Sequence, residues 1–172
     1  IDGGATFTVS NVASNVTVDA SNGAEGSLSG DLTVTLDANA DGVDILTGAS
    51  DTNVSGDGTG TYTVDATDMV DSSDDAADLT DDRTLTLSGT AAAVVTGLSG
   101  KVDASAVSGD LTVTTLDDTD ADDVDIQTGS GSTTINSHLN DEVTVDATNT
   151  ADDDTLTLSG DGSFTVTGLQ AD

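Results

Sequence analysis

The chain has 172 residues, and its 33 acidic residues face only two basic ones, which gives a formal net charge of −31. This charge repels phosphate groups, so the composition excludes nucleic acids and anionic membrane surfaces as partners. Because the chain has no Cys, disulfides and thiolate metal sites are excluded as well. No apolar run is long enough to span a membrane as a helix, so we expect no membrane insertion.

Short segments in which apolar residues alternate with Thr, Ser or Asp follow one another along the whole chain. This period of two predicts β-strands with one buried face. In chain order the segments fall into three types that recur cyclically. The first type covers 7–11, 43–48, 94–98, 124–129 and 164–169. The second, which contains Val-Asp-Ala, covers 16–21, 62–67, 102–105 and 143–148, and the third covers 32–37, 84–89, 111–117 and 155–160.

A longer repeat is superimposed on these segments. The sequence SGDLTVTLD at Ser29 returns as SGDLTVTTLD at Ser108, and DGVDILTG at Asp41 returns as DDVDIQTG at Asp122. The offset is about 80 residues. It divides residues 1–172, which we expect to form a single repetitive solenoid, into two long repeats of roughly 1–98 and 99–172.

Three strand types in cyclic order predict an all-β fold, a parallel β-helix (β-solenoid) in which each coil contains all three types. The alternative is two tandem Ig-like β-sandwich domains, each about the size of the long repeat. A sandwich has a thick core that usually contains several large aromatic residues. Here Phe7, Tyr62 and Phe164 are the only aromatic residues, which favours the narrower solenoid.

The acids are nearly all Asp, since Glu25 and Glu142 are the only glutamates. A short carboxylate held close to the backbone suits turns and oxygen cages for hard cations. The sequence Asp-Ala-Asn-Ala-Asp-Gly-Val-Asp has the alternating oxygen ligands and the sixth-position Gly of the front half of an EF-hand-type loop. We therefore predict calcium ligands at Asp37, Asn39, Asp41 and Asp44, and at the aligned positions Asp118, Asp120, Asp122 and Asp125.

One feature of each loop leaves its geometry open. Gly48 stands where an EF-hand has its twelfth-position glutamate, so other groups would have to complete the site. In the second loop Asp123 replaces Gly42. The alternative for both loops is a solvated acidic turn.

The second strand type supplies a further prediction. In a three-sided solenoid its four Asp residues would form one column, with neighbours about 4.8 Å apart. At that distance two carboxylates repel by about 3 kcal/mol at an effective dielectric constant near 20. Bridging calcium ions at Asp65 and Asp146 would relieve this repulsion, unless insertions interrupt the column of Asp19, Asp65, Asp103 and Asp146.

Signals for catalysis are weak, and we expect no enzyme. His138 is the only His, and it lies in a loop that we take to have no counterpart in the first repeat. Paired carboxylates can be found throughout so acidic a chain and therefore discriminate nothing. Recurring Thr-x-Thr triplets leave one alternative function open, an ice- or glycan-binding module that uses an outward Thr face.

The motifs Val-Asp-Ala, Leu-Thr-Val-Thr and Asp-Gly-Val-Asp-Ile-Leu-Thr-Gly, in a Cys-free array rich in Thr and Asp, resemble repeat regions of large secreted bacterial surface proteins. RTX-type adhesins and calcium-dependent S-layer or fibre proteins are the nearest comparison, although the RTX nonapeptide is absent. The resemblance implies an extracellular, calcium-stabilised scaffold in a cell-surface layer, filament or adhesin stalk. Its expected partners are copies of itself, head-to-tail or lateral, or neighbouring repeats of a longer chain.

Overall fold

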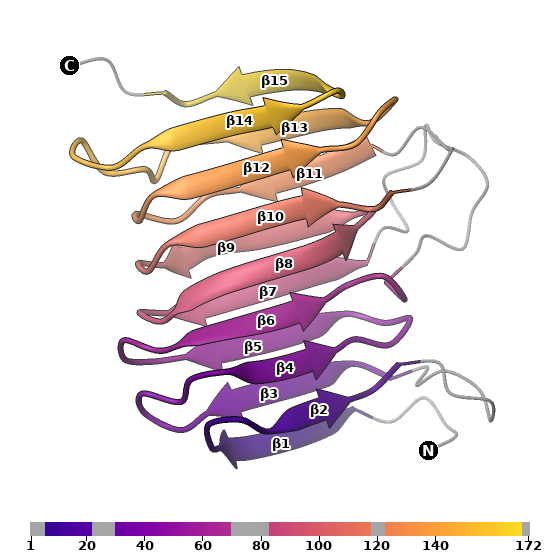
Figure 1. Cartoon of the computed structure of the whole chain (residues 1–172), viewed down its shortest axis with the longest axis vertical. Coiled ribbons are helices and arrows are strands. Elements are labelled where there is room, and N and C mark those ends of the chain that lie inside the picture. Colours follow the sequence, from indigo (N-terminus) through magenta and orange to yellow (C-terminus); the bar gives the residue numbers. More distant parts are fainter. Residues whose placement is uncertain (1–5, 22–29, 70–82, 118–122, 170–172) are drawn as a thin grey trace.

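The computed structural model describes residues 6–21, 30–69, 83–117 and 123–169. These residues form fifteen β-strands and no helix (Figure 1). The odd-numbered strands are β1 (Phe7–Val12), β3 (Leu32–Leu36), β5 (Thr52–Gly56), β7 (Thr84–Gly89), β9 (Lys101–Val107), β11 (Asp123–Gln127), β13 (Glu142–Asp146) and β15 (Ser163–Thr167). The even-numbered strands are β2 (Thr17–Asp19), β4 (Val43–Leu46), β6 (Thr61–Asp65), β8 (Ala92–Leu98), β10 (Leu111–Thr115), β12 (Thr133–Ser137) and β14 (Leu156–Gly160).

The chain winds into a two-sided parallel solenoid. All odd strands form an eight-stranded sheet and all even strands form a seven-stranded sheet, each in the order of the sequence and entirely parallel. Figure 1 shows the two sheets back to back, with β1 and β2 at the bottom and β14 and β15 at the top. The predicted parallel β-helix is confirmed, and the alternative of two Ig-like sandwiches is wrong because such sandwiches are antiparallel.

Each coil contributes two strands and not the three that were expected. The segments β5 and β12, which the sequence pattern did not identify as strands, each follow a first-type segment and complete the alternation between the sheets. Their inward positions begin with a threonine, Thr52 in β5 and Thr133 in β12, which weakens the apolar signal.

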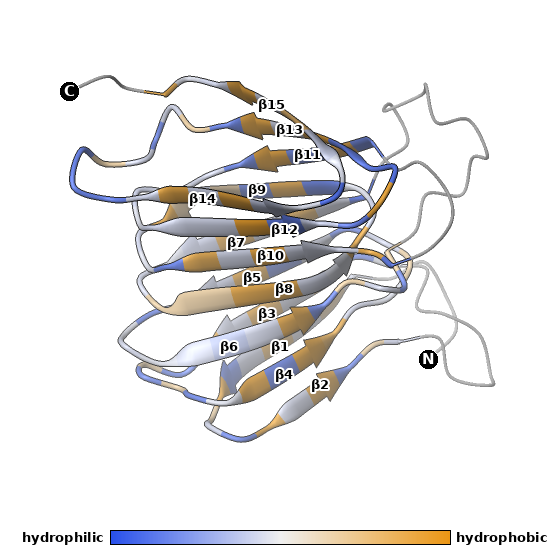
Figure 2. Ribbon diagram, turned by 45° about the horizontal axis from the view of Figure 1, so that its top comes forward, coloured by the Kyte–Doolittle hydropathy of each residue, from blue (hydrophilic) through white to orange (hydrophobic). Residues whose placement is uncertain are grey.

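The core is a narrow stack of inward-facing side chains between the two sheets. On the eight-stranded sheet one row consists of Phe7, Leu32, Thr52, Leu85, Val102, Ile126, Val145 and Val166. On the seven-stranded sheet the matching row consists of Val18, Ile45, Val64, Val95, Val113, Ile135 and Leu158. Figure 2 shows the resulting alternation of hydrophobic and hydrophilic bands along the strands. Fully burying one such side chain contributes about 1.5–3 kcal/mol, so the rows supply the main stabilisation.

The long repeat corresponds to seven strands, or three and a half coils. The strand of SGDLTVTLD is β3 in the eight-stranded sheet, whereas the strand of its repeat is β10 in the seven-stranded sheet. The left-handed residues Asn11, Gly97 and Gly168, at or just after the ends of β1, β8 and β15, mark three equivalent positions. The first repeat therefore runs from β1 to β7 and the second from β8 to β14. A half-turn about the solenoid axis relates them, and β15 begins a third.

Candidate functional site

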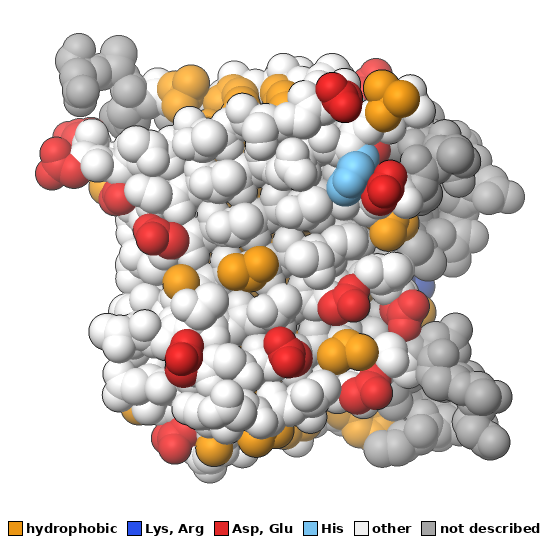
Figure 3. Space-filling view, in the orientation of Figure 1, with side chains coloured by type: hydrophobic (Ala, Val, Ile, Leu, Met, Phe, Trp, Pro, Cys, Tyr) orange, Lys and Arg blue, Asp and Glu red, His pale blue; other side chains and the backbone are white. Residues whose placement is uncertain are grey.

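Acidic side chains on the strands are confined to two half-sheets. One half-sheet consists of β2, β4 and β6, and the other consists of β9, β11 and β13 on the opposite face. Together they carry Asp19, Asp44, Asp65, Asp103, Asp123, Asp125, Glu142 and Asp146. The other nine strands have no charged residue. In Figure 3, which views the seven-stranded sheet, carboxylates lie over the lower strands and along the edges, while the upper centre is uncharged. This diagonal distribution follows from the half-turn between the repeats.

The Val-Asp-Ala motif lies at the end of its strand in β2, β6 and β13, and inside the longer strand β9. In all four copies, the Asp Oδ1 accepts hydrogen bonds from the backbone N–H and the hydroxyl group of the residue two positions later. The hydroxyl oxygens lie 2.5–2.6 Å from Oδ1 and the backbone nitrogens 3.0–3.1 Å. The hydroxyl of Ser21, and then its N–H, lower the pKa of Asp19 from its usual value, and Thr148 does the same for Asp146.

The predicted column of four carboxylates is wrong. Asp19 and Asp65 are both in the seven-stranded sheet, but Leu46 lies between them in the row. The other two, Asp103 and Asp146, are in the eight-stranded sheet with Gln127 between them. Because each pair is two strands apart, about 10 Å, the repulsion expected for adjacent carboxylates does not arise. The argument for calcium at Asp65 and Asp146 from a charged column is thereby lost, and calcium binding there stays a prediction.

The first predicted calcium loop is a hydrogen-bonded corner. Asn39 and Gly42 adopt left-handed conformations, with φ of 63° and 64°, so the chain does bend sharply where the pattern predicts. The Asp37 carboxylate accepts from the N–H of Ala38 at 2.9 Å. The backbone N–H of Asp41 donates to the Ser14 hydroxyl at 3.0 Å, and its carboxylate accepts from the Thr61 N–H at 2.9 Å, so this residue ties three successive coils together.

The remaining predicted ligands are dispersed. Asp44 is exposed on the outer face of β4, and Asp125 lies on β11 in the other sheet. The positions Asp118, Asp120 and Asp122 lie outside the described residues. Within 6–21, 30–69, 83–117 and 123–169, no group of three or more Asp, Glu, His or Cys side chains is placed to hold a metal ion. Calcium binding at both loops stays a prediction.

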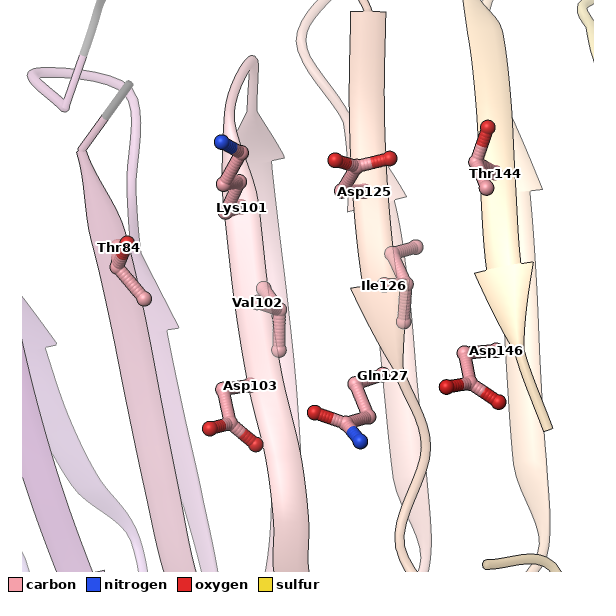
Figure 4. A pocket seen from close by; sticks show the side chains of 9 residues that line it. All are labelled: Thr84, Lys101, Val102, Asp103, Asp125, Ile126, Gln127, Thr144 and Asp146. Atoms are coloured by element: carbon pink, nitrogen blue, oxygen red, sulfur yellow. The ribbon is translucent and has the colours of Figure 1, made fainter. Parts of the chain in front are cut away.

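A shallow groove of about 350 Å³ lies over β9, β11 and β13 on the outside of the eight-stranded sheet. Figure 4 shows polar side chains along it on either side of Val102 and Ile126. The register places Lys101, Asp125 and Thr144 in one row and Asp103, Gln127 and Asp146 in the next. The groove offers mainly hydrogen-bond acceptors together with one ammonium group, which suits cations or polyhydroxylated ligands.

Sequence reasoning missed a buried polar cluster at the corner between β12 and β13. The Asp141 side chain is 1% exposed, and its Oδ2 accepts from the Thr115 hydroxyl and, at 3.1 Å, from the backbone N–H of His138. The Nδ1 of His138 lies 2.9 Å from the carbonyl oxygen of Thr115, so Nδ1 donates. A comparison of 51–65 with 132–146, which are equally long, would have shown Asp141 opposite Gly60, next to a buried strand. The loop of His138 therefore does have a counterpart in the first repeat.

Two uncharged arrays occupy the half-sheets that lack carboxylates. Each array consists of six small polar residues on three neighbouring strands. The first, on β3, β5 and β7, comprises Thr33, Thr35, Asn53, Ser55, Thr86 and Ser88. The second, on β10, β12 and β14, comprises Thr112, Thr114, Thr134, Asn136, Thr157 and Ser159. The half-turn that relates the repeats places the two arrays on opposite faces of the solenoid.

Both ends of the solenoid present apolar side chains that are only partly buried. Phe7, Val9 and Val18 are at one end, and Leu156, Leu158, Phe164 and Val166 are at the other. Their counterparts in the interior coils are almost completely buried. Hydrophobic side chains are visible along the top and the bottom of the molecule in Figure 3.

In the part of the chain that the structure describes, there is no helix that could cross a membrane. No known protein family, curated protein or solved structure matches this chain.

Proposed function

We propose that this chain is a scaffold repeat segment of an extracellular bacterial surface layer, filament or adhesin stalk, stabilised by calcium. One observation carries the proposal, namely the pair of apolar ends of the solenoid. A row of partly exposed Leu, Val and Phe side chains beside a strand edge is a surface that a further coil would cover. Such a molecule is suited to continue as a rod, through copies of itself or neighbouring repeats.

Three of the four end strands also lack charged side chains, one of the features that usually prevent strand addition. Natural sheets protect their edges with charged side chains, Pro or covering segments. Strands β1, β14 and β15 have no charged residue, and the whole chain has no Pro. Solenoids that end as monomers require polar capping coils. Uncharged edges beside exposed apolar rows therefore support end-to-end continuation.

Calcium is the ion that we propose to offset the charge. A net charge of −31 on a compact rod opposes both folding and association, and divalent cations bound by carboxylates at the corners would reduce it. The Asp37–Asp44 corner, with its carboxylates close to the backbone and its two left-handed residues, is the first place to look among the described residues.

The test combines circular dichroism with light scattering, in calcium and after chelation with EDTA. We expect calcium to raise the melting temperature and the particle size, and chelation to reverse both. Magnesium, and NaCl at matched ionic strength, serve as controls, because non-specific screening would respond to them equally. If strand signal and particle size are the same with and without calcium, the calcium part of the proposal is wrong.

The two uncharged arrays favour a second candidate function, binding of ice or a glycan by an outward Thr face. Their rows of hydroxyl and amide groups are regularly spaced because they follow parallel strands. The variants Asn53→Asp and Thr134→Asp each put a charge into the centre of one array. Loss of thermal hysteresis or of polysaccharide binding in these variants would support this candidate, and absence of both activities in the unaltered chain would exclude it.

A further inference from the structure

We propose that successive copies of this chain stack end to end with a half-turn about the solenoid axis. In this arrangement β1 of the next copy adds to β14, and its β2 adds to β15. The eight-stranded sheet of one copy then continues the seven-stranded sheet of its neighbour. This inference rests on the proposed end-to-end assembly and adds its geometry.

The shape of the two ends favours this half-turn. In a two-sided solenoid the chain climbs one strand spacing, about 4.8 Å, in each coil, so each strand lies half a spacing above the one before it. Because the fifteen described strands are an odd number, the last strand lies in the same sheet as the first. The next vacant place above β14 is in the seven-stranded sheet, and it lies half a spacing below the vacant place above β15.

A copy added without rotation does not fit this half-spacing difference in height between the two vacant places. Its β1 would occupy the place above β15, and its β2 would come one half-spacing higher still, which leaves the place directly above β14 empty. With a half-turn, β1 occupies the lower place and β2 the higher one. Every strand edge is then paired, and both apolar rows are covered.

The chain already contains a half-turn of this kind between its two repeats. The second repeat, β8 to β14, follows the first, β1 to β7, with a half-turn that moves the counterpart of β1 into the other sheet, where β8 adds to β6. Across the proposed junction β1 makes the same change of sheet but adds to β14, the counterpart of β7. The half-turn also keeps strand direction, since the two sheets run in opposite directions around the coil. The proposed stacking thus repeats the rotation that already relates the two repeats, with a new pair of strands in contact.

The rows of the sheets give the register across the junction. The row of Ala93, Leu111, Thr133 and Leu156 continues into Phe7 of the next copy, the counterpart of Ala93. The adjacent row continues from Leu158 into Val9, and on the other sheet Val166 meets Val18. On the outside, Thr157 lies beside Thr8 of the next copy. Of the four end strands, only β2 has a carboxylate, Asp19.

Because the chain has no Cys, single introduced cysteines give an unambiguous test. Copies of the full chain carrying Thr8→Cys are mixed with copies carrying Thr157→Cys, in calcium at high protein concentration. They are treated with a cross-linker shorter than the ~10 Å that separates packed sheets. A parallel mixture pairs Thr8→Cys with Thr167→Cys, whose positions share an outward row of the eight-stranded sheet. All three side chains are exposed, so the substitutions leave the core intact.

The half-turn predicts that the mixture of Thr8→Cys with Thr157→Cys forms cross-linked dimers. It predicts that the mixture of Thr8→Cys with Thr167→Cys forms none. Each variant alone serves as a control for head-to-head contacts. The reverse pattern would overturn the half-turn while leaving end-to-end assembly in place. If neither mixture forms dimers and sedimentation finds only monomers, both the half-turn and the end-to-end assembly are refuted.

Discussion

The two long repeats place equivalent strands on opposite faces, and they fill the same coil in different ways. In the first repeat Tyr62 is buried against Gly56, whose ideal Cβ position is only 2.9 Å from a Tyr62 ring carbon. In the second repeat Val143 stands in place of Tyr62, and Ser137 stands in place of Gly56. A pair of one large and one very small residue is thus replaced by two residues of intermediate size. The comparison indicates that the repeat keeps the strand alternation and the coil width, while individual core positions compensate one another.

The corner between β5 and β6 and its counterpart between β12 and β13 contact the coil below by different means. The first repeat turns between β5 and β6 through Asp57-Gly-Thr-Gly60, in which Gly60 lies against the backbone of the coil below. The second turns through His138-Leu-Asn-Asp141, where the buried Asp141 carboxylate binds the coil instead. A close backbone approach in one repeat is replaced by hydrogen bonds to a carboxylate in the other.

The largest expected difference between the repeats concerns the size of the buried residue. Tyr62→Ala is expected to lower the free energy of unfolding by about 3–5 kcal/mol, the range for large aromatic truncations. Val143→Ala removes only two methyl groups and is expected to cost about 2 kcal/mol. Chemical denaturation of the two variants measures both values. Equal losses would contradict the different packing of the two coils.

Replacing the corner carboxylate is expected to have the next largest effect. Asp141→Ala leaves the Thr115 hydroxyl without its acceptor, at a cost of about 1–3 kcal/mol, while the His138 N–H retains the Thr115 hydroxyl oxygen at 2.8 Å as its acceptor. Asp152→Ala, at an exposed position, is the matched control and should be nearly neutral. Thermal melts of both variants provide the measurement, and a neutral Asp141→Ala would show that the cluster contributes nothing.

The compensation between Gly56 and Tyr62 can be tested by copying the second repeat into the first. Gly56→Ser is expected to cost about 1–3 kcal/mol, because the added side chain overlaps the Tyr62 ring. Adding Tyr62→Val restores the pair found at Ser137 and Val143 and should recover part of that loss. A double-mutant cycle measures the coupling. If the two effects simply add, the compensation does not exist.

One feature is the same in both repeats and should respond equally. Thr52 and Thr133 are fully buried, and neither hydroxyl has a hydrogen-bond partner. Replacing either by the isosteric Val removes an unsatisfied polar group, so Thr52→Val and Thr133→Val should each stabilise the fold by about 1 kcal/mol. Urea titration measures the gain. Destabilisation of either variant would indicate that its hydroxyl has a partner after all.

The smallest expected effect is a pH dependence at the Val-Asp-Ala corners. Because the folded-state pKa values of Asp19 and Asp146 lie below the usual value near 3.8, their carboxylates contribute stability above that pH. This contribution is lost as the pH falls through the lowered pKa values. Asp146→Asn and Thr148→Val should each reduce the stability lost between about pH 4 and pH 2. An unchanged pH profile in both variants would contradict this role.

Much of the fold could be predicted from the sequence, because alternating residues determine which face of a strand is buried. The number of strands per coil could not. In β5 and β12 the inward positions hold Thr52, Gly56, Thr133 and Ser137, so these strands lack a continuous apolar alternation. Without them the cycle of strand types has three members per round. When β5 and β12 are included, each repeat has seven strands. Because seven is odd, the second repeat starts in the other sheet, which is the half-turn between the repeats.

The candidate site was predicted less well than the fold. The Val-Asp-Ala motif was identified, but its carboxylates were placed in one column because the two missed strands shifted the assumed stacking. Asp141 was overlooked because a buried carboxylate in a corner has the same sequence signature as a solvated loop. Its burial depends on the coil beneath, through Thr115.

Extension of the solenoid through its ends can be measured directly. Small-angle X-ray scattering of the chain in calcium, across a range of protein concentrations, measures both the length and the cross-section of the particles. We predict that the length increases with concentration while the cross-section stays that of a single solenoid. Particles that remain monomers at every concentration, or that grow in cross-section without growing in length, would contradict the account.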